Sequence, residues 1–422
     1  MADALQIRTA LDKEFRPTRG DYLQTIMIEV TPGRNLASLP LNLGILLDVS
    51  HSMQGTKLEN AKHACHLLLE QLGPQDRAAV CVFSSGARTI APSMFFEADV
   101  KANAQRAVGN LRVEGATELL AGLNQVYAEV APHRTPQVTT FVLVLSDGDP
   151  TDDQGYRVED KTQYLERVAS EFATHGVSLS TIGLGSASDY DAAFLRDLSD
   201  KGSGKFLMSK DPQELADAFQ DEFGRIQSTV LADVTLEVTR LNGVSRRFWR
   251  VLPDKKIFDP PRAQNQTLNI PVGSMQNDQP QAYLLDVVTS APQETGGRGL
   301  LCQVKAIVTI DGQPFETSTN VTVGYSDNEL ELAQRNNEVQ RLIEEANDFK
   351  LQVDLEQAVK TGDRKRMTSI LATKKKMTQR LGKSTATKVL EDMEDTLQTG
   401  GDISPDALAV SSEETKKTKR LA

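Results

Sequence analysis

The side chains best placed for chemistry are five oxygen donors that follow, or stand between, strongly apolar segments. These donors are Asp48, Ser50, Ser52, Thr117 and Asp147. Carboxylate and hydroxyl oxygens without sulfur ligands suit a hard divalent cation such as Mg²⁺. The donors lie far apart in the sequence, so they form one site only if the fold brings their loops together.

The segments around these residues predict such a fold. Short apolar runs alternate with stretches that have the apolar spacing of helices, and the runs are 41–48, 78–83, 138–145 and 177–184. This alternation over residues 37–228 predicts a doubly wound α/β domain with a parallel sheet. Ligands bind such folds at the carboxyl ends of the strands, which is where the loops that carry the donors begin.

These residues resemble a known motif. The D-x-S-x-S pattern at 48–52, the downstream Thr117 and the Asp-Gly pair at 147–148 are similar to the metal-ion-dependent adhesion site of von Willebrand factor type A domains. The resemblance covers about residues 38–228. The order of an N-terminal strand, this domain and a following sandwich also resembles bacterial calcium-activated-chloride-channel-like proteins and inter-alpha-inhibitor-type proteins.

The resemblance implies a role for each donor. Ser50, Ser52 and Thr117 would contact the metal directly, whereas Asp48 and Asp147 would act mostly through water. The metal would be Mg²⁺, with Mn²⁺ or Ca²⁺ as alternatives. Neutral hydroxyl ligands leave the cation under-neutralised, so an Asp or Glu of a partner protein would complete its coordination.

Two neighbouring residues form the expected rim of this site. His51 stands where the family usually has glycine, and we interpret it as a variable loop residue beside the entry position. Asp149 follows the Asp-Gly pair and makes the rim acidic. Both are candidates for contact with a partner.

The rest of the chain has a different pattern. Residues 229–326 alternate β-branched runs with Asn-Gly and Asp-Gly turns, which predicts an antiparallel β-sandwich. Residues 1–36 contain a similar run, so the simplest arrangement places them in the sandwich, with the α/β domain as an insertion. Residues 327–399 predict a C-terminal helical hairpin with a coiled-coil-like seam, and residues 400–422 predict a disordered tail.

The charge of the helical segment changes sign along the chain. Residues 328–359 carry three basic and eight acidic side chains, whereas residues 360–388 carry ten basic and one acidic. The basic stretch either pairs with the acidic helix before it or binds an anionic surface. The sequence favours pairing, because opposite charges adjoin and aromatic residues for base stacking are absent.

Composition excludes several classes of protein. A net charge of −11 argues against a general nucleic-acid binder, and no apolar run is long enough for a transmembrane segment. The three cysteines are scattered, and the first residues lack the pattern of a secretory signal. We therefore expect a cytoplasmic protein of bacterial type with reduced cysteines.

The leading hypothesis is a non-enzymatic, divalent-metal-dependent interaction module that acts as an adaptor or regulator. The resemblance implies ATPase assemblies among its candidate partners, and the oligomeric state stays open. One alternative is a metal-dependent hydrolase, in which only His51 or Asp149 could serve as the general base. Another is a scaffold that binds anionic surfaces through residues 360–388.

Overall fold

The computed structural model describes residues 4–34, 36–147, 150–152, 156–184, 191–209, 212–258, 267–290, 297–310 and 312–416. Its internal contacts divide the chain into two units. The α/β unit comprises residues 37–233 and 310–312. The sheet-and-helix unit comprises residues 1–36, 234–309 and 313–422. Within the described ranges, no helix is both long and apolar enough to cross a membrane.

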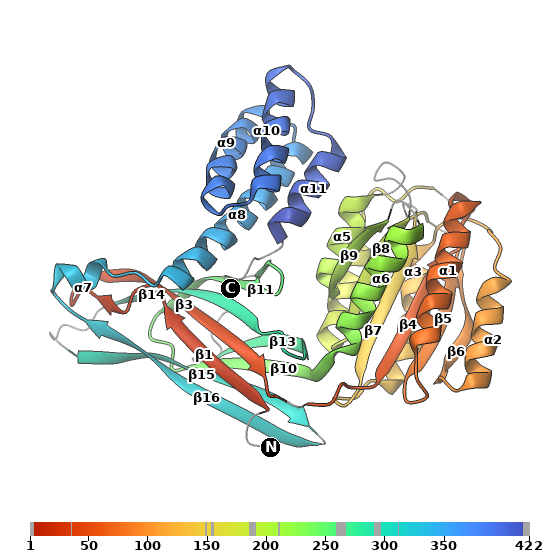
Figure 1. The fold of residues 1–422 in the computed structure, drawn as a ribbon, viewed down its shortest axis with the longest axis horizontal. Coiled ribbons are helices and arrows are strands. Elements are labelled where there is room, and N and C mark those ends of the chain that lie inside the picture. The colour runs from red at the N-terminus through yellow and green to blue at the C-terminus, as the bar shows by residue number, and fades with distance from the viewer. Residues whose placement is uncertain are drawn as a thin grey trace. The chain divides into compact units, whose positions relative to one another are not determined.

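The α/β unit is built on a six-stranded sheet with the strand order β6-β5-β4-β7-β8-β9 (Figure 1). The strands are β4 (Leu41–Asp48), β5 (Arg77–Phe83), β6 (Ala87–Phe95), β7 (Thr139–Ser146), β8 (Ser178–Leu184) and β9 (Ser203–Ser209). Neighbouring strands are parallel except β5 and β6, which pair antiparallel. The predicted α/β fold is confirmed, and the edge strand β6 is an element that the sequence pattern did not predict.

Helices cover both faces of this sheet. They are α1 (Thr56–Gln71), α2 (Ala98–Gly109), α3 (Leu119–Val130), α4 (Thr162–Arg167), α5 (Ala192–Lys201) and α6 (Pro212–Gln227). Successive residues of a strand point to opposite faces, so Ile45 of β4 packs in the core with α1, α2 and α6, and Leu46 packs in the core with α3, α4 and α5. An added Cβ on Gly44 would lie 2.6 Å from Val126 of α3, so glycine permits the close approach of this helix.

Two five-stranded sheets form the other unit, with the orders β1-β3-β14-β11-β12 and β13-β10-β15-β16-β2. Their strands are β1 (Leu5–Leu11), β2 (Phe15–Arg16), β3 (Asp21–Pro32), β10 (Thr229–Thr239), β11 (Val244–Leu252), β12 (Lys256–Phe258), β13 (Leu268–Gln276), β14 (Gln281–Ser290), β15 (Gly297–Ile310) and β16 (Gln313–Tyr325). The N-terminal β3 pairs antiparallel with β14, as the sequence predicts for an inserted α/β domain. The expectation of a wholly antiparallel sandwich is wrong at one edge, where β2 and β16 pair in parallel.

The C-terminal segment is helical. Its elements are α7 (Glu329–Ala333), α8 (Asn337–Lys360), α9 (Arg364–Arg380), α10 (Ser384–Gln398) and α11 (Pro405–Lys416). The first half of α8 packs on the sheet β1-β3-β14-β11-β12 through an apolar cluster that includes Val339, Leu342, Met27 and Trp249. The side chain of Asp363 caps α9 by accepting a hydrogen bond from the Arg366 N–H.

Two predictions for this segment need correction. The expected hairpin is a larger set of packed helices, because α9 ends before Gly382 and α10 continues in a new direction. The expected disordered tail is wrong for Pro405–Lys416, which form α11. Ile403, just before α11, is buried in the apolar cluster of α8, α9 and α10. Residues 417–422 lie outside the described residues.

Candidate functional site

The carboxyl ends of β4 and β7 bring the predicted donors together. All residues of both strands are buried, so Asp48 and Asp147, which end or follow them, are held in place by the core of the sheet. Ser50 and Thr117 are also buried, whereas Ser52 lies exposed in the short 3₁₀ turn at His51–Met53. The two carboxylates of the site are therefore positioned by the carboxyl ends of β4 and β7.

Hydrogen bonds join four of the donors into one network. Asp48 Oδ1 accepts from the Ser50 backbone N–H at 2.8 Å, and Asp48 Oδ2 accepts from Ser146 Oγ at 2.6 Å. Ser52 Oγ donates to Asp147 Oδ1 at 2.7 Å. The Oγ atoms of Ser50 and Ser52 lie 2.9 Å apart. Because the Ser52 proton is directed to Asp147, Ser52 Oγ accepts from Ser50 Oγ, and one of its two lone pairs remains for another ligand.

Main-chain hydrogen bonds hold the third loop beside the first. Gly115 O accepts from the His51 N–H at 3.2 Å, and Val49 O accepts from the Glu114 N–H at 2.7 Å. Thr117 exchanges two 2.8 Å bonds with Thr151, through its own backbone N–H and C=O groups. Within the described part of the chain, nothing is hydrogen bonded to Thr117 Oγ1. The hydrogen bonds of Thr117 to Thr151 thus use only its backbone groups.

Burial changes the ionisation of Asp48, the carboxylate at the end of β4. Burial, together with a smaller effect from the charge of Asp147, raises the pKa of Asp48 to about 6, although hydrogen bonds from Ser146 and Ser50 oppose the rise. A cation beside these oxygens would favour the charged form. The electrostatics of the site thus suit an added positive charge.

Lys57 is a member of the site that the sequence motif did not predict. Lys57 Nζ donates to Asp147 Oδ2 at 2.5 Å, although the Lys57 side chain remains 27% exposed. A signal for this residue was present, because a lysine in the first turn of a helix opposes the helix dipole unless a carboxylate offsets it. Lys57 is the second residue of α1.

The predicted rim is only partly described. The His51 side chain is exposed, and its backbone N–H is the group that binds the neighbouring loop. Asp149 lies outside the described residues. Over the ranges that the structure covers, no three His, Cys, Asp or Glu side chains gather as a metal-ligand cluster. A cation at this site would therefore depend on the hydroxyl oxygens.

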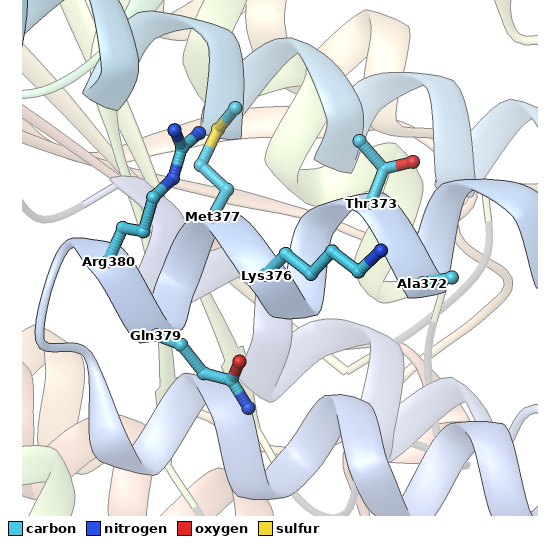
Figure 2. A pocket seen from close by; sticks show the side chains of 6 residues that line it. All are labelled: Ala372, Thr373, Lys376, Met377, Gln379 and Arg380. Carbon is cyan, nitrogen blue, oxygen red and sulfur yellow. The ribbon is translucent and has the colours of Figure 1, made fainter.

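The basic segment 360–388 favours the paired alternative. Six of its ten basic side chains form ion pairs with carboxylates, namely Arg364–Asp402, Arg366–Asp354, Lys374–Asp348, Lys375–Glu394, Arg380–Glu344 and Lys383–Glu345. A hollow of about 810 Å³ runs along α9 and is open to solvent. Figure 2 shows its lining residues, which include Lys376, Met377 and Arg380. Only two of the basic side chains line this hollow.

A comparison with protein families agrees with this geometry. The model of the von Willebrand factor type A domain matches residues 42–221. The chain contains a von Willebrand factor type A domain. Type A domains generally mediate protein–protein interactions.

Relatives of the type A domain occur in bacteria and animals. The uncharacterized protein YfbK of Escherichia coli is 27% identical over 199 residues, which are 47% of this chain and 33% of YfbK. Inter-alpha-trypsin inhibitor heavy chain H1 of Bos taurus is 26% identical over 209 residues, which are 48% of this chain and 22% of that protein. The chain thus spans less than half of the length of these relatives.

Two solved structures share the fold of nearly the whole chain. A von Willebrand factor type A protein from Catenulispora acidiphila is similar with a TM-score of 0.81 and 18% identity, over 99% of this chain and 97% of that one. The ArnB paralog VWA2 from Sulfolobus acidocaldarius is similar with a TM-score of 0.64 and 16% identity, over 98% of each chain. The combination of a type A domain with sheets and C-terminal helices is therefore a shared architecture.

Proposed function

We propose that this chain is a non-enzymatic, Mg²⁺-dependent interaction module that captures a carboxylate of a protein partner at the type A domain. The observation that carries the proposal is the hydrogen-bond network of the donors. Ser52 directs its proton to Asp147, and Thr117 Oγ1 has no hydrogen bond to the described residues. Hydroxyl oxygens oriented by carboxylates in this way fit a hard cation that contacts the hydroxyls.

The residues present fit the metal by charge as well as by ligand type. Ser50, Ser52 and Thr117 would hold the cation. Asp147 orients the Ser52 hydroxyl, Asp48 holds the Ser50 backbone N–H, and both carboxylates supply negative charge. A bound Mg²⁺ supplies an electrophilic position that a carboxylate of the partner can occupy. Mn²⁺ and Ca²⁺ use the same oxygen ligands and are the alternative cations.

The hydrolase alternative has less support. A general base must reach a water at the metal, and no described residue forms a side-chain hydrogen bond that would orient the exposed His51 ring there. An adaptor or regulator requires only the metal position and a shaped rim. We include ATPase assemblies among the candidate partners. A cytoplasmic location stays a prediction, and the three buried cysteines, which form no disulfide, agree with it.

The test combines metal titration with partner capture. Isothermal titration with Mg²⁺ should give saturable binding by the wild type and none by Asp48→Asn, a variant that keeps the shape of the buried side chain. Immobilised wild-type protein should capture from a native lysate proteins that are lost with EDTA and absent from the Asp48→Asn control. Peptide fragments of each captured protein, with Glu or Asp exchanged for Gln or Asn, then identify the carboxylate. Absence of Mg²⁺ binding overturns the proposal.

A further inference from the structure

The ion pair of Lys57 with Asp147 changes what the candidate site can bind. The Asp147 side chain is fully buried, and its two oxygens have different partners: Ser52 donates to Oδ1 and Lys57 to Oδ2. The ammonium group therefore belongs to the same hydrogen-bond network as the hydroxyl donors. It lies in the first turn of α1, where no helix effect favours a positive charge.

Counting the charges of this network shows the consequence. Asp48 and Asp147 contribute two negative charges, and Lys57 reduces the total to one. A divalent cation then makes the loaded site singly positive. Without Lys57 the loaded site would be neutral, and a carboxylate would be drawn only by the local field of the metal.

We propose that Lys57 sets the affinities of this site in opposite directions, weakening the binding of the divalent metal and strengthening the capture of a carboxylate by the loaded site. This inference rests on the proposed function. The physical reason is that like charges repel across a few ångströms of a partly buried site, while the same ammonium group attracts an incoming anion. Lys57 is thus a residue that determines specificity without being a metal ligand.

The experiment uses the full chain and three variants. Lys57→Met removes the charge and keeps most of the stem, and Lys57→Arg keeps the charge. Lys62→Met is the matched control, because Lys62 lies on the same helix and pairs with the exposed Glu59. Isothermal titration with Mg²⁺ should show about tenfold tighter binding by Lys57→Met, and affinities within about twofold of wild type for Lys57→Arg and Lys62→Met.

A second measurement tests the anion directly. Acetate is titrated into each Mn²⁺-saturated protein, and water proton relaxation follows the displacement of metal-bound water. Lys57→Met should require several-fold more acetate than the wild type, and the other two variants should match the wild type. Circular dichroism with saturating metal shows whether each variant is folded, and Lys57→Gln, which also removes the charge, replaces Lys57→Met if that variant is not.

The outcomes separate the two proposals. No binding of Mg²⁺ or Mn²⁺ by the wild type overturns the proposed function and this inference with it. Binding with equal metal and acetate affinities in wild type and Lys57→Met overturns the inference alone. A loss of metal binding in Lys57→Met also overturns it, because Lys57 would then hold Asp147 in position for the metal. Loss of binding in Lys57→Arg leads to the same conclusion.

Discussion

Two clusters of charged and hydroxyl side chains in this chain have opposite designs. One is the candidate site at the ends of β4 and β7. The other, which we name the helical charge cluster, comprises Lys255, Glu345, Asp348, Lys374 and Lys383. The first has an exposed serine and a hydroxyl with no hydrogen bond to the described residues, whereas the side chains of the second are at most 6% exposed.

The lysines and carboxylates of the helical charge cluster form short ion pairs. Lys374 Nζ lies 2.7 Å from Asp348 Oδ1, and Lys383 Nζ lies 2.6 Å from Glu345 Oε2 and 3.1 Å from Asp348 Oδ2. Lys255 Nζ lies 2.7 Å from Glu345 Oε2. Three ammonium groups thus share two carboxylates.

The C-terminal helix completes this cluster. Lys255 donates to Thr415 O at 2.7 Å, and Lys374 donates to Thr415 Oγ1 at 2.8 Å. Thr415 lies in the last turn of α11, where carbonyl groups carry partial negative charge. Buried charges that pair with one another thus fix the packing of these helices, although Glu345 Oε1 has no hydrogen-bond partner among the described residues. The candidate site differs in that its hydroxyl donors include an exposed serine, which a ligand can reach.

The largest expected effect breaks the helical charge cluster. Asp348→Asn leaves Lys374 buried without its carboxylate, which should lower the free energy of unfolding by about 3–5 kcal/mol. Trp249 is the only tryptophan of the chain and packs against α8, so its fluorescence during urea unfolding reports this unit. The control Asp354→Asn removes a partner of Lys350 and Arg366 at the surface and should cost about 0–1 kcal/mol. Equal losses of unfolding free energy in Asp348→Asn and Asp354→Asn would show that burial does not strengthen the pair of Lys374 and Asp348.

The next largest expected effect is a change of folding stability with pH that comes from Lys255. Burial, helped by the charge of Lys383, lowers the pKa of Lys255 to about 8, although Glu345 and Asp348 oppose the shift. Between pH 8 and the ordinary lysine pKa of about 10.4, the unfolded state binds more protons than the folded state, so this group makes stability rise with pH. Below pH 8 both states hold the proton, and the cost of burying the charge is fully present.

The difference between wild type and Lys255→Met isolates this contribution. From pH 7.5 to 10, the wild type should gain about 1–3 kcal/mol relative to Lys255→Met. Urea unfolding followed by Trp249 fluorescence gives both curves. Lys305→Met, which removes a surface partner of Glu316, should keep a constant difference from wild type over this range. A constant difference for Lys255→Met as well would mean that Lys255 titrates like a solvated lysine.

The two regions also differ in how far the sequence could predict them. Asp48 and Asp147 follow continuous apolar runs, and a buried strand determines where its last residue lies. The basic and acidic segments predicted pairing between helices. They could not show that Lys374 and Asp348 are fully buried, because long charged side chains usually reach solvent.

Lys57 and α11 escaped prediction for related reasons. A lysine on a surface helix has many rotamers. Lys57 adopts the one that reaches Asp147, a residue that follows β7 and is far away in the sequence. The α11 sequence is polar, which is typical of a disordered tail. It docks through hydroxyl groups such as those of Ser411 and Thr415, which bind the buried Gln352 and Lys374. Specific polar partners of this kind leave no periodic apolar signal.

The candidate site should respond to mutation in function and not in stability. Thr117→Ala removes a hydroxyl with no hydrogen bond to the described residues, so it should weaken Mg²⁺ binding at least tenfold, or by about 1.4 kcal/mol. Its melting temperature in EDTA should equal that of the wild type. Thr135→Ala, an exposed position before β7 at the other end of the sheet, is the control and should change neither quantity. A fall in melting temperature would make Thr117 a structural residue.

The smallest effect is expected at the rim, where His51→Gly restores the usual family residue. The backbone N–H of residue 51 donates to Gly115 O, and glycine keeps this bond. Since the exposed ring is not among the metal donors, Mg²⁺ affinity should stay within about twofold, with up to about 1 kcal/mol of stability lost to the flexibility of glycine. Isothermal titration measures the first quantity and urea unfolding the second. Metal-dependent hydrolysis by the wild type that disappears in His51→Gly would instead make this ring a general base and support the hydrolase alternative.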